Sequence, residues 1–313
     1  MKPHSTALAF GVATVGIALF SAMDGFMKHL SLVIGTYNAL LWRTGVGALI
    51  AALFYFGQRT PWPKGDALQV HLTRGLLGVP MALLFFWGLA RVPMAQAIAL
   101  AFVAPLIALY LAALLLREQI ERRAIFASLL GFAGVLVIFG GQAEADLGPE
   151  AFRGSIAILA SAGLYAYNII LMRRQALLAG PIEVAFFTSG LMGASFVFLA
   201  VLQLLIFWIV PAAPMPFAVV IPPLAEFKPI VTAAVLAFAS LLLLSWAYAR
   251  AEAQHLAPVE YTSFIWAAII GALYFGERVQ PLTLVGAAMI VVACLIAATR
   301  RTPPNAGIEG VFA

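Results

Sequence analysis

Asp24 and Lys28 lie one helical turn apart in the segment SAMDGFMKHL, at the end of a long apolar run. Residues four apart share one face of a helix, so this carboxylate and ammonium can pair. Pairing would soften the cost of burying an isolated charge at a membrane centre, which is roughly 2.5 to 3.5 kcal/mol. Two interpretations stay open: a lysine that reaches the membrane surface beside a local partner, or a charged pair that meets a polar substrate.

Other candidate substrate contacts are the few polar and aromatic side chains inside apolar runs, because polar residues there are costly and usually functional. An amino-acid zwitterion needs a partner for each charge and, if aromatic, a flat apolar wall. Arg43 or Lys28 could bind its carboxylate. Asp24, Asn168 or Gln96 could accept from its ammonium. Tryptophan and tyrosine also gather at membrane interfaces whatever the function. The remaining predicted cavity residues are Phe20, Asn38, Trp87, Tyr165, Trp246, Tyr261 and Trp266.

Four further residues are predicted to have structural or gating roles, namely Pro105, Glu118, Pro258 and Glu277. Pro105 falls inside an expected helix, where proline removes a backbone hydrogen bond and can act as a kink or a hinge. Glu118 and Glu277 end two expected helices at opposite faces of the membrane. Bonds to neighbouring helix ends or loop amides are therefore expected for both.

The elements that must position these residues are membrane helices. Hydrophobic residues make up 64% of the 313 residues and charged residues 10%, with a mean hydropathy of +1.02. A soluble chain carries about 25% charged residues. The net charge of +5 indicates topology and not nucleic-acid binding, because the basic residues form short clusters between apolar runs. With Cys294 as the only cysteine, a disulfide within the chain or a cysteine metal cluster is excluded. No cofactor or metal is expected.

Apolar runs long enough to cross about 30 Å of hydrocarbon recur along the whole chain. They are too long and too uniformly apolar for barrel strands, so the predicted fold class is an all-α integral membrane protein. Most lysines and arginines fall in the inner segments if the N-terminus is inside, which predicts that both termini are cytoplasmic. The ten predicted spans are 8–27, 37–57, 68–90, 95–116, 123–141, 154–172, 184–208, 229–249, 257–275 and 281–299.

The chain also contains a weak internal repeat. At an offset of 145 residues, Lys28 falls on Arg173. Because a unit of five helices has an odd number of crossings, the second copy must enter the membrane upside down. Inverted repeats are typical of secondary transporters, whose substrate site lies near the midplane. The predicted organisation is a first unit over 1–147, an inverted second unit over 148–302 and a disordered tail over 303–313. At an offset of 159 the aligned pairs include Trp87 and Trp246, Arg91 and Arg250, and Glu118 and Glu277.

Several loose motifs follow one another in order along both halves. They are Lys28, Arg43, Pro105, Glu118, Gly131 and Gly134 in the first, and Ala257-Pro258-Val259, Gly276-Glu277 and Gly286 in the second. In this order they resemble the ten-helix EamA-type branch of the drug/metabolite transporter superfamily, over essentially the whole chain. The first helix lacks the Trp-Gly pair often present there. The resemblance implies two inverted five-helix halves and export of small metabolites across the bacterial inner membrane. The chain is also similar, in a general way, to exporters of aromatic amino acids.

The sequence therefore predicts a secondary transporter, expected to be monomeric, that exports small amphipathic metabolites by alternating access. Aromatic or neutral amino acids are the favoured substrates, and a broad-specificity drug or metabolite efflux pump is the near alternative. A membrane enzyme acting on lipid phosphates would need a charged cluster at one surface, for which only 117–123 is a candidate. A channel fits the repeat less well. Proton coupling through Asp24 or Glu260 and facilitated diffusion both stay open.

Overall fold

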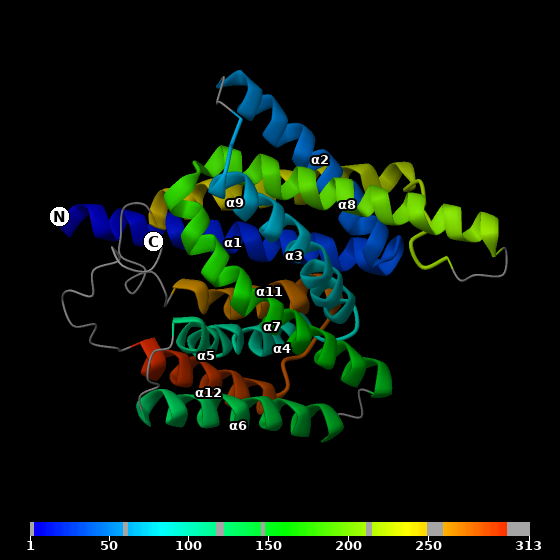
Figure 1. The fold of residues 1–313 in the computed structure, drawn as a ribbon. Helices are drawn as coiled ribbons and strands as arrows, with labels where there is room; N and C mark the ends of the chain where they lie inside the picture. The colour runs from blue at the N-terminus through cyan, green and yellow to red at the C-terminus, as the bar shows by residue number, and fades with distance from the viewer. Residues whose placement is uncertain are drawn as a thin grey trace.

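A computed structural model describes residues 3–58, 62–116, 122–144, 148–210, 215–248 and 259–298. Within these ranges the chain forms helices joined by turns and short links, and no strand is present among them. The helices are arranged as a bundle in which α1 begins and α12 ends at the same end, on the left in Figure 1. Their bounds are α1 (Pro3–Val33), α2 (Thr36–Gly57), α3 (Asp66–Leu89), α4 (Met94–Ala101), α5 (Ala104–Leu116), α6 (Arg122–Glu144), α7 (Gly148–Leu178), α8 (Pro181–Ile209), α9 (Leu224–Tyr248), α11 (Thr262–Phe275) and α12 (Pro281–Ala298).

The helices coincide with the predicted spans. Six described segments are long and apolar enough to cross a membrane: Leu8–Val33, Thr36–Gly57, Asp66–Leu89, Gly148–Met172, Pro181–Ile209 and Leu224–Ala247. Four shorter apolar segments take the other predicted positions, namely Met94–Ala108, Ile125–Gly141, Thr262–Phe275 and Pro281–Ile296. The prediction of an all-α integral membrane protein is confirmed.

The fourth predicted span differs from the expectation, because it is broken. Helix α4 ends at Ala101 and α5 begins at Ala104, with a turn between them. Pro105 is thus in the first turn of α5, where an amide hydrogen would have no helical partner anyway. The expectation that Pro105 lies in the middle of a helix was wrong, whereas the interruption of the span beside it agrees with the predicted kink. The proline inside a helix of this half is Pro80, in α3.

The contacts between helices follow the pattern that is expected for two related halves. The most extensive contacts join α1 with α9, α3 with α7, α2 with α8, and α6 with α12 (Figure 1). Exchanging the halves in chain order converts the α1–α9 pair into the α7–α3 pair. The same exchange returns α2–α8 and α6–α12 to themselves. This is the pattern of a twofold relation between the inverted halves, whose division at residue 147 stays a prediction.

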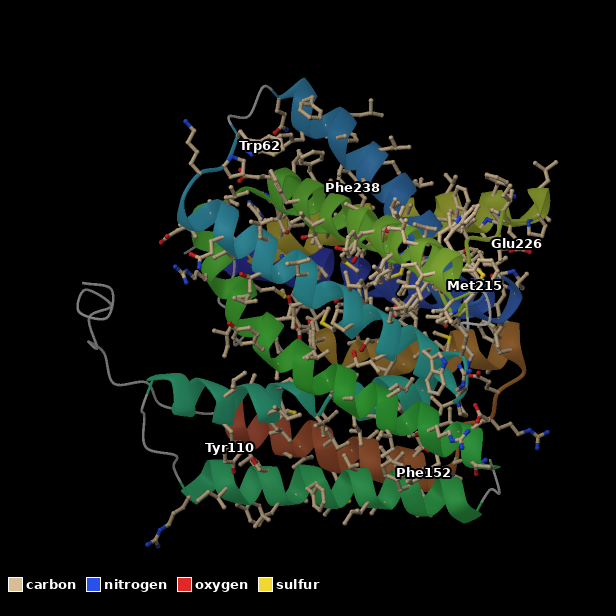
Figure 2. The ribbon with its side chains drawn as sticks, turned by 45° about the vertical axis from the view of Figure 1, so that its right-hand side comes forward. Trp62, Tyr110, Phe152, Met215, Glu226 and Phe238 are labelled. Carbon is tan, nitrogen blue, oxygen red and sulfur yellow. The ribbon has the colours of Figure 1, made fainter. Side chains whose placement is uncertain are left out.

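Two pairs of contacting polar side chains at opposite ends of the bundle show the same relation. His29 Nε2, near the end of α1, lies 3.0 Å from Oε2 of Glu226 in the first turn of α9. Arg174, at the repeat offset of 145 from His29, lies 3.2 Å from Asp66 at the start of α3. Glu226 and Trp62 mark these two ends in Figure 2. We call them the Lys28 end, where α1 ends, and the His71 end, where α3 begins.

Candidate functional site

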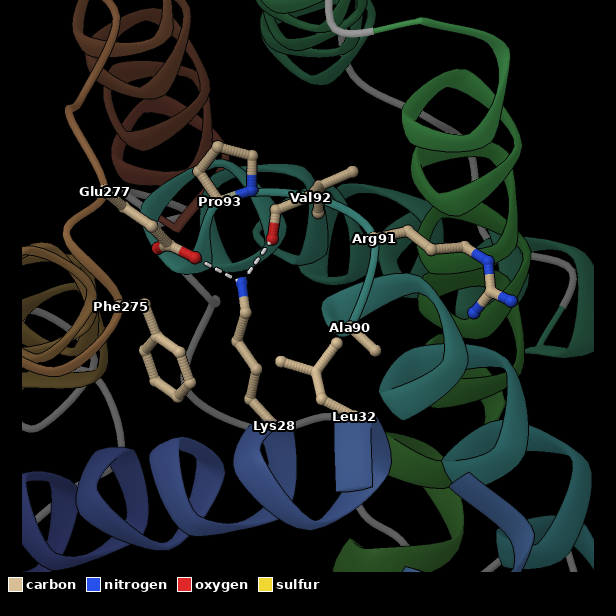
Figure 3. A pocket seen from close by; sticks show the side chains of 8 residues that line it. All are labelled: Lys28, Leu32, Ala90, Arg91, Val92, Pro93, Phe275 and Glu277. Carbon is tan, nitrogen blue, oxygen red and sulfur yellow. Dashed lines mark hydrogen bonds and ion pairs between the residues drawn. The ribbon is translucent and has the colours of Figure 1, made fainter. Parts of the chain in front are cut away.

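An ion pair between the buried Lys28 and the partly buried Glu277 lies at the Lys28 end (Figure 3). The ammonium of Lys28 donates to the carbonyl of Val92 at 2.6 Å and pairs with Glu277 in the α11–α12 link. The other carboxylate oxygen of Glu277 accepts from the amide of Met94, the first residue of α4, at 2.7 Å. The Phe275 ring lies 5.3 Å from the ammonium. A single cluster therefore ties together α1, α4 and the α11–α12 link.

This geometry corrects one expectation. Lys28 pairs with Glu277, which is far away in sequence, and not with Asp24 one turn before it. A pocket of about 320 Å³ opens beside the pair. Arg91 lines it but points away, toward α7, with its guanidinium carbon 3.6 Å from the centre of the Trp87 ring. Trp87 thus lies at the end of the bundle in a cation–π contact. The full lining is Lys28, Leu32, Ala90, Arg91, Val92, Pro93, Phe275 and Glu277.

Asn38 lies at the same end of the bundle, and both its side-chain nitrogen and its side-chain oxygen form hydrogen bonds. Its amide nitrogen donates to the carbonyl of Ala218 at 3.1 Å, and its oxygen accepts from the amide of Val220 at 2.9 Å. The indole of Trp42 donates to the carbonyl of Val220 at 2.9 Å. These bonds hold the start of α2 to the link before α9. Asn38 therefore holds the link before α9 in place, and its side chain does not face an empty space.

Several buried polar atoms of the described residues have no hydrogen-bond partner, and apart from Ser31 they lie away from the end of α1. They belong to α1, α2, α9 and α11, and each of these helices contacts at least one of the others. Because a buried polar group without a partner costs about 1–3 kcal/mol, such a group calls for an explanation. The atoms are Oγ of Ser21, Oδ1 of Asp24, Oγ of Ser31, Nε of Arg43, Oγ of Ser240 and Nε1 of Trp266.

Asp24 and Arg43 are the charged members of this group. Asp24 is 1% exposed and lies nine residues before the end of α1, or about 14 Å at the helical rise. Arg43 lies seven residues after the start of α2, or about 10 Å along its axis. No direct ion pair joins them among the described residues, although α1 and α2 are in contact. Both are therefore well inside the membrane-spanning region.

A second polar network lies at the His71 end, between α3, α7 and α8. The guanidinium of Arg74 donates to Oδ1 of Asn168 at 3.0 Å and also to Gln175. The amide nitrogen of Gln175 lies 2.7 Å from Nδ1 of His71, whose Nε2 lies 2.9 Å from the carboxylate of Glu183. Asn168, a predicted cavity residue, is thus held by Arg74.

Sequence reasoning missed this network. Neither His71 nor Arg74 was among the residues predicted to have a role. One signal was available, because His71 and Arg74 are three residues apart and Asn168 and Gln175 are seven apart, so each pair shares a helical face. The sequence could not show that these two faces meet.

Replacing Asn168 with leucine is expected to destabilise the protein by about 1–3 kcal/mol, because the Arg74 Nε–H loses its acceptor in a buried place. The thermal unfolding midpoint of the purified protein in detergent measures this. Thr73→Ala is the matched control, since the exposed Thr73 hydroxyl donates only to Gln69 of its own helix. Equal midpoints for the two variants would show that Arg74 does not depend on Asn168.

The other predicted site residues are spread over the bundle. Gln96 is buried and donates to Ser155 Oγ at 3.2 Å, joining α4 to α7. The rings of Tyr261 and Phe102 are 5.2 Å apart. Phe20 is 42% exposed and Tyr165 38%. Trp246 and Trp266 pack against a small cluster of Ala9, Ala13, Ile17, Ala247 and Val259. Glu118 and Pro258 lie outside the described residues.

The interior group, which leaves out Ser31 near the end of α1, therefore combines a carboxylate oxygen, a guanidinium nitrogen, two hydroxyls and an indole nitrogen. None of these atoms has a hydrogen-bond partner among the described residues. Within the same ranges no three histidine, cysteine, aspartate or glutamate side chains are placed to hold a metal ion. This arrangement could bind a small polar molecule by charge and hydrogen bonds. The Lys28 end and the His71 end, by contrast, use most of their polar groups to tie helices together.

Comparisons with known proteins agree with this architecture. The sequence model of the EamA-like transporter family matches residues 7–140 and again 152–299. The second match begins 145 residues after the first, which is the repeat offset of the first two helices. A solved crystal structure, 21% identical, has the same fold with a TM-score of 0.58 over 93% of this chain and 97% of that one.

Curated relatives are transporters with different cargo. The pseudopaline exporter CntI of Pseudomonas aeruginosa (strain UCBPP-PA14) is 24% identical over 286 residues, 91% of this chain and 93% of that protein. The S-adenosylmethionine uptake transporter of Rickettsia bellii (strain RML369-C) is 25% identical over 303 residues, 94% of each chain. These two names do not support the narrower similarity to aromatic amino-acid exporters, which stays a prediction.

Proposed function

Because this chain belongs to the EamA-like transporter family, we propose that it exports a small amphipathic metabolite across the bacterial inner membrane by alternating access. The favoured cargo is an aromatic or neutral amino acid. The relatives' names include both an exporter and an uptake transporter. The direction of transport is therefore set by features of each protein and not by the fold alone.

One observation carries the proposal. Unsatisfied polar groups, including Asp24 and Arg43, lie between α1, α2, α9 and α11, further into the bundle than the ion pair of Lys28 and Glu277. A transporter that alternates needs such a midplane site together with an end that can close over it. Breaking the Lys28–Glu277 pair would release α1 from α4 and from the α11–α12 link. Both termini are proposed to be cytoplasmic, which places the Lys28 end outside.

The cargo class rests on the chemistry of the interior group. An amino acid presents an ammonium and a carboxylate close together, and the site offers Asp24 and Arg43. S-adenosylmethionine, the cargo named for one relative, also carries an amino-acid head group. Nothing in this role requires a chemical step, so the proposed activity is transport alone.

Counterflow in proteoliposomes tests the function. Vesicles loaded with unlabelled phenylalanine, leucine or a cationic dye are diluted into the labelled form of the same solute. We expect transient accumulation of labelled phenylalanine, and none in vesicles without protein. Accumulation of the dye alone would favour the broad-specificity efflux pump, and no accumulation of any amino acid would reject the proposed cargo. Repeating the assay across a pH gradient separates proton coupling from facilitated diffusion.

A further inference from the structure

We propose that Asp24 and Arg43 bind the two charges of one zwitterionic cargo, an α-amino acid whose side chain carries a polar atom, as in tyrosine or tryptophan. The inference rests on the proposed function and deepens it by naming the recognition residues. In this arrangement Asp24 accepts from the ammonium and Arg43 donates to the carboxylate.

The burial of Asp24 without a hydrogen-bond partner for its Oδ1 is the first observation that supports the proposal. Its side chain is 1% exposed, and its Oδ1 has no hydrogen-bond partner among the described residues. A buried carboxylate oxygen without a donor lowers stability. A cargo ammonium would supply the missing donors and so remove this cost. Lys28, the nearby cation on the same helix face, is already occupied by Glu277 and Val92.

Arg43 is the second support. Its Nε is buried and unpartnered, so its guanidinium has donor capacity to spare. Helices α1 and α2 are in contact, yet Asp24 and Arg43 do not form an ion pair with each other among the described residues. Opposite charges that were only structural partners would gain by direct contact. A small molecule that carries both charges could therefore bridge them. In an α-amino acid the ammonium nitrogen and the carboxyl carbon are both bonded to the same α-carbon.

The third observation that supports the proposal is a set of three neutral polar groups, which lie about one helical turn from Asp24 toward the His71 end. The packing register places them there, because Gly25 of α1 lies against Ile270 of α11 and Gly16 lies against Leu244 of α9. Ser21, four residues before Gly25, is therefore level with Trp266, four residues before Ile270. Antiparallel α9 brings a residue near position 239 to the same level.

The groups at that level are Ser21 Oγ, Ser240 Oγ and Trp266 Nε1, all buried and without partners among the described residues. The level lies about 4.5 Å from Asp24 along α1 at the helical rise. A side chain leaving the zwitterion toward the His71 end would reach it. The Trp266 indole offers both a flat wall and a hydrogen-bond donor, while the two hydroxyls can donate or accept. This combination suits an aromatic ring that bears a hydroxyl or a ring N–H.

The test uses three probes that share one phenol side chain and differ in their charged groups. Tyrosine carries both charges, tyramine lacks the carboxylate, and 3-(4-hydroxyphenyl)propionate lacks the ammonium. Their binding to the full-length detergent-purified protein is measured by the rise in thermal unfolding midpoint with ligand concentration. Arg43→Gln should weaken tyrosine about ten- to hundredfold, the effect of losing a charge-assisted hydrogen bond, while tyramine is unchanged. Asp24→Asn should weaken tyrosine similarly while the propionate is unchanged.

Arg43→Lys and Asp24→Glu keep the charges and should retain part of the tyrosine affinity. If Arg43→Gln or Asp24→Asn fails to fold, these two charge-conserving variants provide the test instead. Arg153→Gln is the matched control, because Arg153 is exposed and pairs with Glu150 on the surface. Equal weakening of all three probes, or no weakening of tyrosine, would overturn the inference, as would a wild-type protein that binds none of them.

The outcome separates this inference from the proposed function. Wild-type counterflow of phenylalanine with no charge-selective effect in the variants would leave the transporter intact and reject the zwitterion site. Charge-selective binding of tyrosine without counterflow of any amino acid would support the site and reject amino-acid transport.

Discussion

Replacing Glu277 with alanine is expected to lower the free energy of unfolding by about 3–5 kcal/mol, the effect of removing one partner of a buried ion pair. The Lys28 side chain is 5% exposed in that pair, so loss of the carboxylate leaves the ammonium with the Val92 carbonyl and whatever water enters from the adjacent pocket. The change also removes the acceptor of the Met94 amide. Thermal unfolding in detergent, followed by intrinsic fluorescence or by loss of monodispersity, measures the effect.

Two controls separate the ion pair from a general effect of mutation at this end. Glu226→Ala removes an equivalent carboxylate from His29, which is 46% exposed, so the expected loss is below about 1 kcal/mol. Adding Lys28→Met to Glu277→Ala should recover part of the stability, because no buried charge is then left alone. If Glu277→Ala unfolds at the same temperature as Glu226→Ala, the pair does not hold the Lys28 end together.

Replacing Gly134 with valine is expected to destabilise the contact between α6 and α12 by about 1–3 kcal/mol, and to reduce transport with it. A Cβ at Gly134 would lie 2.7 Å from the carbonyl oxygen of Gly286, and one at Gly286 would lie 2.5 Å from that of Gly134. Both obstacles are backbone atoms, which cannot rotate away, so the helices must separate. Glycines allow such close approach in membrane proteins.

Gly140→Val is the matched control, because Gly140 lies on the same helix and a Cβ there meets nothing within 4 Å. We expect the thermal unfolding midpoint of Gly140→Val to stay close to that of the wild type, while Gly134→Val falls clearly below it. Similar losses in both would mean that valine disfavours α6 itself, and that the contact with α12 is not responsible.

Much of the architecture could be read from the sequence, because hydrocarbon imposes a simple rule on it. A span needs about 20 apolar residues with all backbone groups bonded internally, so its length and composition reveal it directly. The repeat offset also followed from the sequence, and the two family matches begin at the same spacing. A kink near Pro105 was predicted, but the division of this span into two helices was not, because the exact place where a helix is interrupted depends on the neighbours that pack against it.

The site residues were only partly predictable. The rarity of charges in apolar runs identified Asp24, Lys28, Arg43 and Glu277 as unusual, since each such charge is costly. Spacing along one helix then suggested a local partner for Lys28. In the structure that partner is Glu277, because the α11–α12 link brings its carboxylate to the end of α1. Long-range pairing of this kind leaves no periodic signal in either segment.

By itself the sequence determined that this protein is a helical membrane protein with two related halves, because solvation by lipid acts on every residue of a span. Tertiary structure decided which polar groups are satisfied and which are not. Arg74 and Asn168 find each other across α3 and α7, whereas Asp24 and Arg43 stay apart. The reason is physical: burial and polarity are properties of single residues, but a hydrogen bond requires two atoms to meet, and only the packing of helices sets that distance.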